Sequence, residues 1–154
     1  MKVFDLIGDA VFNALYFIQT CVRIVKIAKA FNIRFTKQQL RFLLNYKSHL
    51  DLSAWPRASG KTTCAIAWDL IYIRRPNPFK KEQKPTTLTF ENFFVPDPDI
   101  FRHGIRNYKD LYIQYMQSYF LCAAHGLALT PVNFEPGYKL HRYFTGRKGA
   151  SRHD

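Results

Sequence analysis

The triplet Gly60-Lys61-Thr62 constrains the fold more than any other feature of the sequence, because of the segments on either side of it. Residues 49–54 alternate short apolar and polar side chains, which is typical of a strand, and residues 61–73 have the composition of a helix that stops before Pro76. A strand, a loop with GK[ST] and a helix together form a phosphate-binding loop, whose backbone N–H groups surround phosphate oxygens at the start of the helix. The order of these segments predicts an α/β fold.

The residues of this loop match the chemistry of a nucleotide site. Gly60 lets the backbone approach a phosphate closely, Lys61 would neutralise the β- and γ-phosphates, and the Thr62 hydroxyl would bind Mg²⁺. The expected site for ATP and Mg²⁺ consists of Ser59, Gly60, Lys61, Thr62 and Thr63. Trp55 stands where the usual GxxxxGK[ST] pattern has its first glycine, so a helix start that contains Gly-Lys-Thr by chance is the alternative.

The N-terminal segment has the pattern of a long amphipathic helix. Between residues 3 and 30, apolar side chains recur at three- and four-residue steps, at Val11, Leu15, Ile18, Val22, Val25 and Ala28. We expect this helix to pack on the protein with a solvated basic edge (Arg23, Lys26, Lys29), although that edge could instead touch phosphate or lipid headgroups. The apolar run of residues 10–22 is shorter than the ~20 residues that cross a bilayer, so no membrane span is expected.

Two more helices are expected. Thr36, with Gln39 three residues later, fits a capping box at the start of a helix over about residues 37–46. A long helix runs from about residue 98 to 124, with Gly126 as its stop. Four tyrosines on this helix are expected to pack in the core, with a base-stacking platform as the alternative. They are Tyr108, Tyr112, Tyr115 and Tyr119.

Strands are expected in two further regions. Residues 86–95 are rich in Thr and Phe, which favours a strand. Residues 127–134 and 138–145 flank Glu135-Pro136-Gly137, a pattern that suggests a hairpin.

The charge of the chain favours an anionic partner. The formal net charge is +12, which is typical of proteins that bind nucleic acid, nucleotides or acidic membrane surfaces, although a solvated basic surface has the same composition. The C-terminal basic residues could bind the phosphate backbone of double-stranded DNA without sequence preference, or they could form a loose tail. They are Arg142, Arg147, Lys148 and Arg152. Neither the three cysteines nor the five histidines have the spacing of a metal site.

Residues 56–63, followed by an apolar helix, resemble the variant Walker A loop of viral terminase large subunits. These are the ATPases that pump double-stranded DNA into the preformed capsids of tailed phages and herpesviruses. In that family the first glycine is often missing and an arginine lies inside the loop. The resemblance implies that Arg57 contacts the γ-phosphate and acts in catalysis with Lys61. It also implies that Gln38 or Gln39 contacts adenine, although ordinary helix polarity explains these glutamines equally well.

The same resemblance implies a fold, binding partners and a cellular location. The fold is a partial P-loop NTPase domain, a three-layer αβα arrangement, over residues 31–154, with residues 1–30 as an additional N-terminal amphipathic helix. The partners would be double-stranded DNA, a portal protein and a small terminase subunit. The location would be the cytoplasm of an infected host cell, transiently at the viral procapsid.

One motif of the family is missing. A packaging ATPase needs an apolar strand that ends in Asp-Glu, where Asp holds the Mg²⁺ shell and Glu positions water. No run of this kind occurs in the sequence. We therefore expect the N-terminal part of a packaging ATPase, either a fragment or one half of a split polypeptide with a companion chain, that binds ATP weakly and hydrolyses it poorly. The alternatives are a noncatalytic basic nucleic-acid-binding module and another P-loop virus assembly ATPase or helicase.

Overall fold

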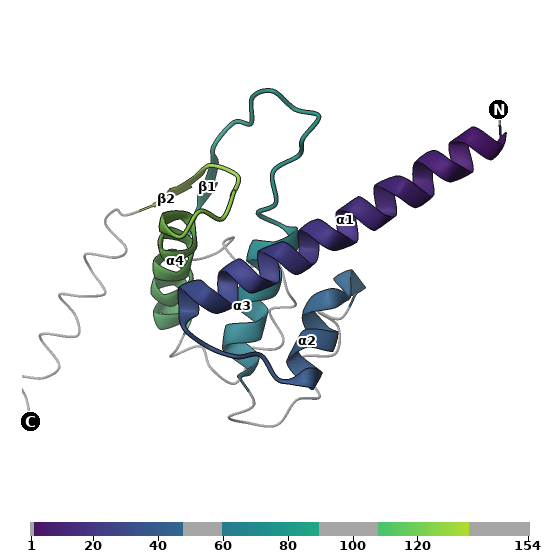
Figure 1. The fold of residues 1–154 in the computed structure, drawn as a ribbon. Helices are drawn as coiled ribbons and strands as arrows, with labels where there is room; N and C mark the ends of the chain where they lie inside the picture. The colour runs from purple at the N-terminus through teal and green to yellow at the C-terminus, as the bar shows by residue number, and fades with distance from the viewer. Residues whose placement is uncertain (1, 48–59, 90–107, 136–154) are drawn as a thin grey trace, which may run out of the picture.

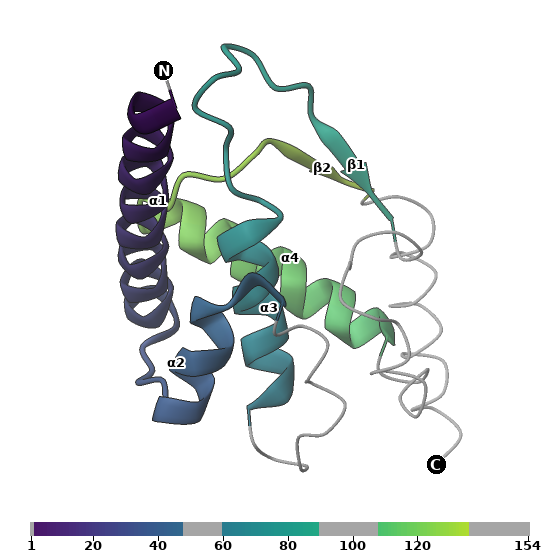
Figure 2. The same cartoon turned by 90° about the vertical axis from the view of Figure 1, so that its right-hand side faces the viewer.

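The computed structural model describes residues 2–47, 60–89 and 108–135 of the chain. Helices predominate over strands in this part (Figure 1). The elements, in chain order, are α1 (Lys2–Phe31), α2 (Lys37–Leu44), α3 (Lys61–Tyr72), β1 (Thr86–Leu88), α4 (Tyr108–Ala124) and β2 (Val132–Phe134). α3 packs against α1, α2 and α4, while the two strands lie together beside α4 (Figure 2).

The expected three-layer αβα P-loop fold is wrong for the described residues. Their sheet has two strands of three residues each, and the helices pack mainly on one another instead of covering the faces of a sheet. The reason lies in α3, where every residue from Cys64 to Ile71 is buried, so that this helix needs helical neighbours around its whole circumference. The strand expected over residues 49–54 and the greater part of the one over 86–95 lie outside the described residues.

The described sheet is a parallel pair, and the expected hairpin is a separate pairing that the described residues do not test. β1 and β2 are parallel, with Thr86 opposite Val132 and Leu88 opposite Phe134. Parallel neighbours need a crossover connection, and α4 lies in the chain between them. The hydroxyl of Tyr112 in α4 donates to Leu88 O at 3.0 Å, and its ring packs edge-on against Phe134, so one side chain of α4 holds both strands. The second arm of the expected hairpin, residues 138–145, lies outside the described residues.

The local signals for helix ends are confirmed. Thr36 caps α2 in a complete capping box, in which the Thr36 hydroxyl accepts from Gln39 N at 3.2 Å and Gln39 Oε1 accepts from Thr36 N at 2.9 Å. α2 ends at Leu44, slightly before the expected residue 46. α4 ends just before Gly126, whose φ of +84° lets Leu127 N bond back to Cys122 O at 3.0 Å. The expected start of this helix near residue 98 lies outside the described residues.

α1 is the long helix that the sequence predicts, but it packs with a different face. The expected face is exposed to solvent at Val11, Leu15, Ile18, Val22 and Val25. The residues buried against the rest of the protein are Thr20, Arg23, Ile24, Ile27 and Ala30. The face with Thr20 and Arg23 is buried because both side chains form hydrogen bonds with residues at the C-terminal end of α3 and just after it. A purely apolar face could not form these bonds.

Three of the four tyrosines expected in the core pack there, as predicted, while the side chain of Tyr108 lies outside the described part of the structure. Tyr112, Tyr115 and Tyr119 are buried, and each hydroxyl is hydrogen-bonded. Tyr119 donates to Thr130 O, which attaches α4 to the segment before β2. Buried rings of this kind do not offer a face for stacking against nucleic acid bases.

Candidate nucleotide site at the start of α3

The candidate site begins with the geometry of Gly60. This residue precedes α3 with φ +77° and ψ 23°, the left-handed region that favours glycine, and its carbonyl accepts the first helical bond from Cys64 N at 2.9 Å. No side chain of Gly60 can cap the helix, and the first N–H groups of any helix have no acceptor inside it. The N-terminal end of α3 therefore carries a partial positive charge and donors suited to an anion.

Gln39 contributes an amide group to this end of α3. A Cβ placed on Gly60 would lie 2.6 Å from Gln39 Nε2, so the amide nitrogen sits directly against the glycine. The capping box explains this orientation, because Gln39 Oε1 accepts from Thr36 N and the amide nitrogen is turned the other way. Gln38, the other candidate for adenine, is exposed. The structure thus brings together Gln39 and Gly60, which are distant in sequence.

The residues after Gly60 have different surroundings. Lys61 and Thr62 occupy the first turn of α3 and are partly exposed. Thr63 lines a cavity of about 250 Å³ together with Gln114 and Ser118, which places it on the side of α3 that faces α4. Arg57 and Ser59 lie outside the described residues, as do Arg142, Arg147, Lys148 and Arg152.

This donor set fits a phosphate group better than a bare metal ion. Magnesium prefers oxygen ligands, and carboxylates above all. Within the described ranges, no three His, Cys, Asp or Glu side chains gather where they could hold a metal. Thr62 could supply one hydroxyl to Mg²⁺, so the ion would have to arrive on the phosphates of a nucleotide and take most of its ligands from them and from water. The positive helix end, Lys61 and the Gln39 amide are all suited to the phosphates themselves.

A buried carboxyl group lies further along α3, and sequence reasoning missed it. Asp69 is fully buried, and its Oδ1 accepts a hydrogen bond from the hydroxyl of Tyr115 and lies 3.7 Å from Arg74 Nε. Arg74 Nε also donates to the Tyr115 hydroxyl at 3.1 Å. Burial raises the pKa of Asp69 to about 6, against the opposing effects of Tyr115 and Arg74. The signal in the sequence was the single acidic residue within an otherwise apolar helix.

This cluster supports the fold and does not face the candidate site. Asp69 Oδ2 has no hydrogen-bond partner within the described part of the chain, and it is shielded from solvent. Asp69 lies eight residues after Lys61, about 12 Å along the helix axis. The cluster connects the C-terminal half of α3 to α4, and it does not contact the N-terminal end of α3.

The side chain of Arg23 binds the C-terminal end of α3. Arg23 donates from Nη2 to Leu70 O at 2.6 Å, from Nε to Ile71 O at 3.2 Å and from Nη1 to Ala128 O at 2.6 Å. Burial, and then the neighbouring Arg75, lower the pKa of Arg23 to about 10. A cation suits the negative end of a helix dipole. Arg23 is therefore not available for phosphate or lipid headgroups, the alternative that the sequence left open for this basic edge.

The comparisons with known proteins add no relative: no protein-family model matches the sequence, and neither a curated protein nor a solved structure matches it. The arrangement around Gly60 is therefore interpreted from its own geometry.

Proposed function

We propose that this chain binds a nucleoside triphosphate at the N-terminal end of α3, as the nucleotide-binding part of a DNA-packaging motor of the terminase type. The observation that supports the proposal is the contact between the Gln39 amide and Gly60. The phosphate-loop motif assigns Gly60 to the phosphates of ATP, and the terminase resemblance assigns Gln39 to its adenine. The two residues, expected at the same ligand for different reasons, are neighbours in the fold.

The chemistry of the site favours phosphate as the bound group. The open helix end provides backbone N–H donors, Lys61 provides a full positive charge, and Gln39 Nε2 provides a further donor beside Gly60. Hydrogen bonds to a charged group each contribute about 1.5–3 kcal/mol. Loss of Lys61 should therefore weaken binding roughly 10- to 150-fold. The proposal concerns binding, because the sequence lacks the acidic pair that hydrolysis of ATP requires.

Binding of a fluorescent ATP analogue with Mg²⁺ tests the proposal. Lys61→Ala should abolish most of the binding, whereas Lys47→Ala, which removes the same charge from an exposed position after α2, should leave it nearly unchanged. Equal losses in the two variants would mean that the analogue binds a basic surface without a specific site. Absence of binding in the native chain would also refute the proposal.

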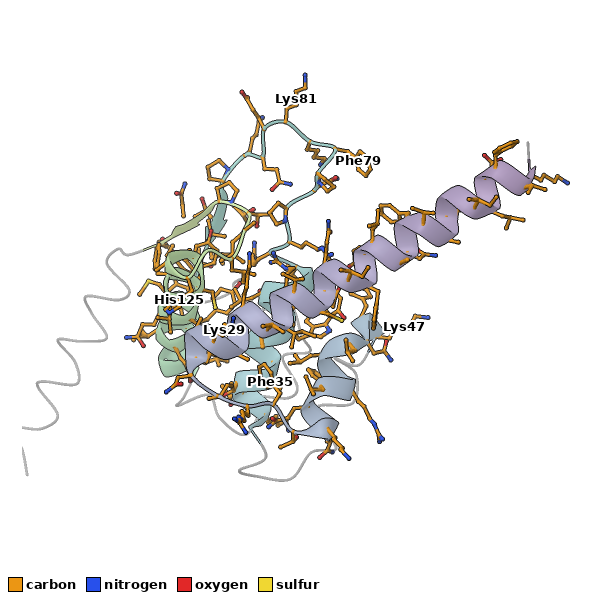
Figure 3. All side chains as sticks on the ribbon, in the orientation of Figure 1. Lys29, Phe35, Lys47, Phe79, Lys81 and His125 are labelled. Atoms are coloured by element: carbon orange, nitrogen blue, oxygen red, sulfur yellow. The ribbon has the colours of Figure 1, made fainter. Side chains whose placement is uncertain are left out.

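A second function, contact with nucleic acid, is favoured by the loop between α3 and β1. Phe79 is exposed in this loop, and Lys80, Lys81 and Lys84 are exposed around it. Figure 3 shows the labelled Lys81 at the outer end of the loop and Phe79 on the flank of the loop that faces α1, where Phe79 lines a cavity with Phe12 and Tyr16. Lysines beside an exposed aromatic ring can contact phosphates and stack on a base. We propose this loop as a DNA contact that acts beside the nucleotide site.

Salt dependence distinguishes this contact from a general charge effect. Replacement of the three lysines by alanine should lower DNA affinity and reduce the salt slope by about one unit for each phosphate that the chain no longer neutralises. Phe79→Ala should weaken binding to single-stranded DNA more than to duplex DNA, because only unpaired bases can stack on the ring. If both changes leave affinity and slope as in the native chain, the loop does not bind DNA.

A further inference from the structure

The N-terminal half of α1 projects away from the rest of the protein and leaves large apolar side chains in water (Figure 1). The buried residues of α1 begin only at Thr20. Before that point, Val3, Phe4 and Leu6 are all more than 60% exposed. Apolar surface of this extent on a projecting helix indicates that another surface covers it.

The exposed residues form a continuous stripe with the spacing of a coiled-coil seam. We call it the outer stripe, and it consists of Phe4, Gly8, Val11, Leu15, Ile18, Val22 and Val25. The steps between these residues alternate regularly between four and three, which is the 3.5-residue period of two helices that wind around each other. Its large side chains are between 47% exposed, at Val22, and 80% exposed, at Phe4. A second helix with apolar residues at the same period could therefore pack along the stripe.

We propose that the outer stripe pairs with the outer stripe of a second copy of this chain, in antiparallel orientation. A two-fold symmetric pair of this kind would set Leu15 against Ile18 of the second copy, and Val11 against its Val22. Gly8 would lie opposite Val25 and leave room for the neighbouring Phe4 side chain. All the central layers of the pair are apolar.

The charges beside the stripe determine the orientation. Asp5 and Lys26 each follow a stripe residue by one position, so they flank the stripe on the same side. In the antiparallel pair, Asp5 of each copy meets Lys26 of the other. In a parallel pair these residues would be 21 positions apart, about 32 Å along the axis. Lys26 Nζ donates to Gly126 O at 3.3 Å, and an ammonium group with three N–H donors can keep this bond.

A membrane is a less suitable neighbour for this helix. By length and composition α1 could cross a membrane. However, the rest of the protein contacts α1 from Tyr16 onwards, where Arg75 donates to Tyr16 O and lies over the Tyr16 ring, which leaves residues 2–15, about 21 Å, for a hydrocarbon core of about 30 Å. Asp5 and Asp9 lie within that segment, and carboxylates are costly in hydrocarbon.

Sedimentation of the full chain over a range of concentrations tests the pairing. The native chain should be dimeric, and Leu15→Glu or Ile18→Glu should make it monomeric. Phe17→Glu is the matched control, because Phe17 is equally exposed, at 53% against 55% and 56%, but lies off the stripe. This variant should stay dimeric. Circular dichroism of each variant checks that the helices remain. A native chain that is monomeric at every concentration, or a Phe17 variant that dissociates as readily as the others, would overturn the proposal.

Charge reversal tests the orientation. Asp5→Lys and Lys26→Asp should each weaken the dimer several-fold, and the two changes together should restore it. Failure of the double variant to recover would refute the antiparallel arrangement. Vesicles that contain phosphatidylserine test the membrane alternative: binding by a monomeric chain that Leu15→Glu abolishes would assign the stripe to lipid. Dimerisation through α1 does not depend on nucleotide binding at α3.

Discussion

The side-chain amide of Gln39 fills the space in which a Cβ at position 60 would lie, with its Nε2 2.6 Å from that point. Gln39 cannot simply turn away, because its Oε1 accepts a hydrogen bond from Thr36 N. Gly60 is therefore required both by its own backbone, with φ +77°, and by its neighbour.

Gly60→Ala should destabilise the protein by about 1–2 kcal/mol for the left-handed backbone, with a further cost for displacement of Gln39. Urea denaturation measures this. In the double variant Gly60→Ala with Gln39→Ala, the cost of displacing Gln39 should disappear, whereas the cost of the left-handed backbone should remain. A Gly60→Ala chain as stable as the native one would mean that residue 60 needs neither the left-handed backbone nor the space beside Gln39.

Gln39→Glu should separate the structural role of residue 39 from its role in binding. Glutamate still accepts from Thr36 N, so the capping box and the stability should remain. It lacks the amide N–H donor, however, and its charge repels phosphate, so affinity for the ATP analogue should fall at least as far as in Lys61→Ala. Gln38→Glu, one residue earlier and exposed, is the control. Equal affinity in the native chain and Gln39→Glu would remove residue 39 from the site.

Arg23→Met should lower the free energy of unfolding by about 3 kcal/mol, because methionine keeps the apolar stem but leaves two carbonyl groups at the end of α3, and that of Ala128 after α4, without their charged donor. Lys26→Met, on an exposed part of the same helix, should change it by less than about 0.5 kcal/mol. Chemical denaturation compares the two. Similar losses would show that Arg23 acts only through general charge.

Asp69 should make the stability fall as the pH rises from about 4 to 6. Burial raises the pKa of its carboxyl from 3.8 to about 6, so the folded chain binds this proton more tightly than the unfolded chain. The free energy of unfolding then decreases with pH across this window, by an amount on the order of 3 kcal/mol, and levels off above it. Asp69→Asn should flatten the decrease, whereas Asp9→Asn, on exposed α1, should not. Urea denaturation at several pH values would contradict this if Asp69→Asn kept the native slope.

Local signals in the sequence predicted local structure well. The capping box of Thr36 and Gln39 and the stop at Gly126 depend on residues within one helical turn, and both are confirmed. The sequence also singled out Gln39 and Gly60, although their contact depends on how α2 packs against α3.

The failures concern choices that tertiary packing makes. α1 carries apolar residues on more than one face, and periodicity alone could not tell that the face with Arg23 and Thr20 would be buried. The α/β prediction relied on a short motif and its neighbours, which do not determine how many strands a sheet has. Asp69 was missed because a lone acid in a helix is usually exposed.

The parallel pairing of β1 and β2 also has a consequence for the order of folding. Thr86 and Val132 are 46 positions apart, since 132 − 86 = 46, and the whole of α4 lies in the loop that their pairing closes. Closing such a loop costs conformational entropy, and the contacts that offset this cost form only when α4 is already packed against the other helices and can hold both strands. The capped helices can form early from contacts within a few residues, so the two strands should pair last, and their pairing should complete the fold.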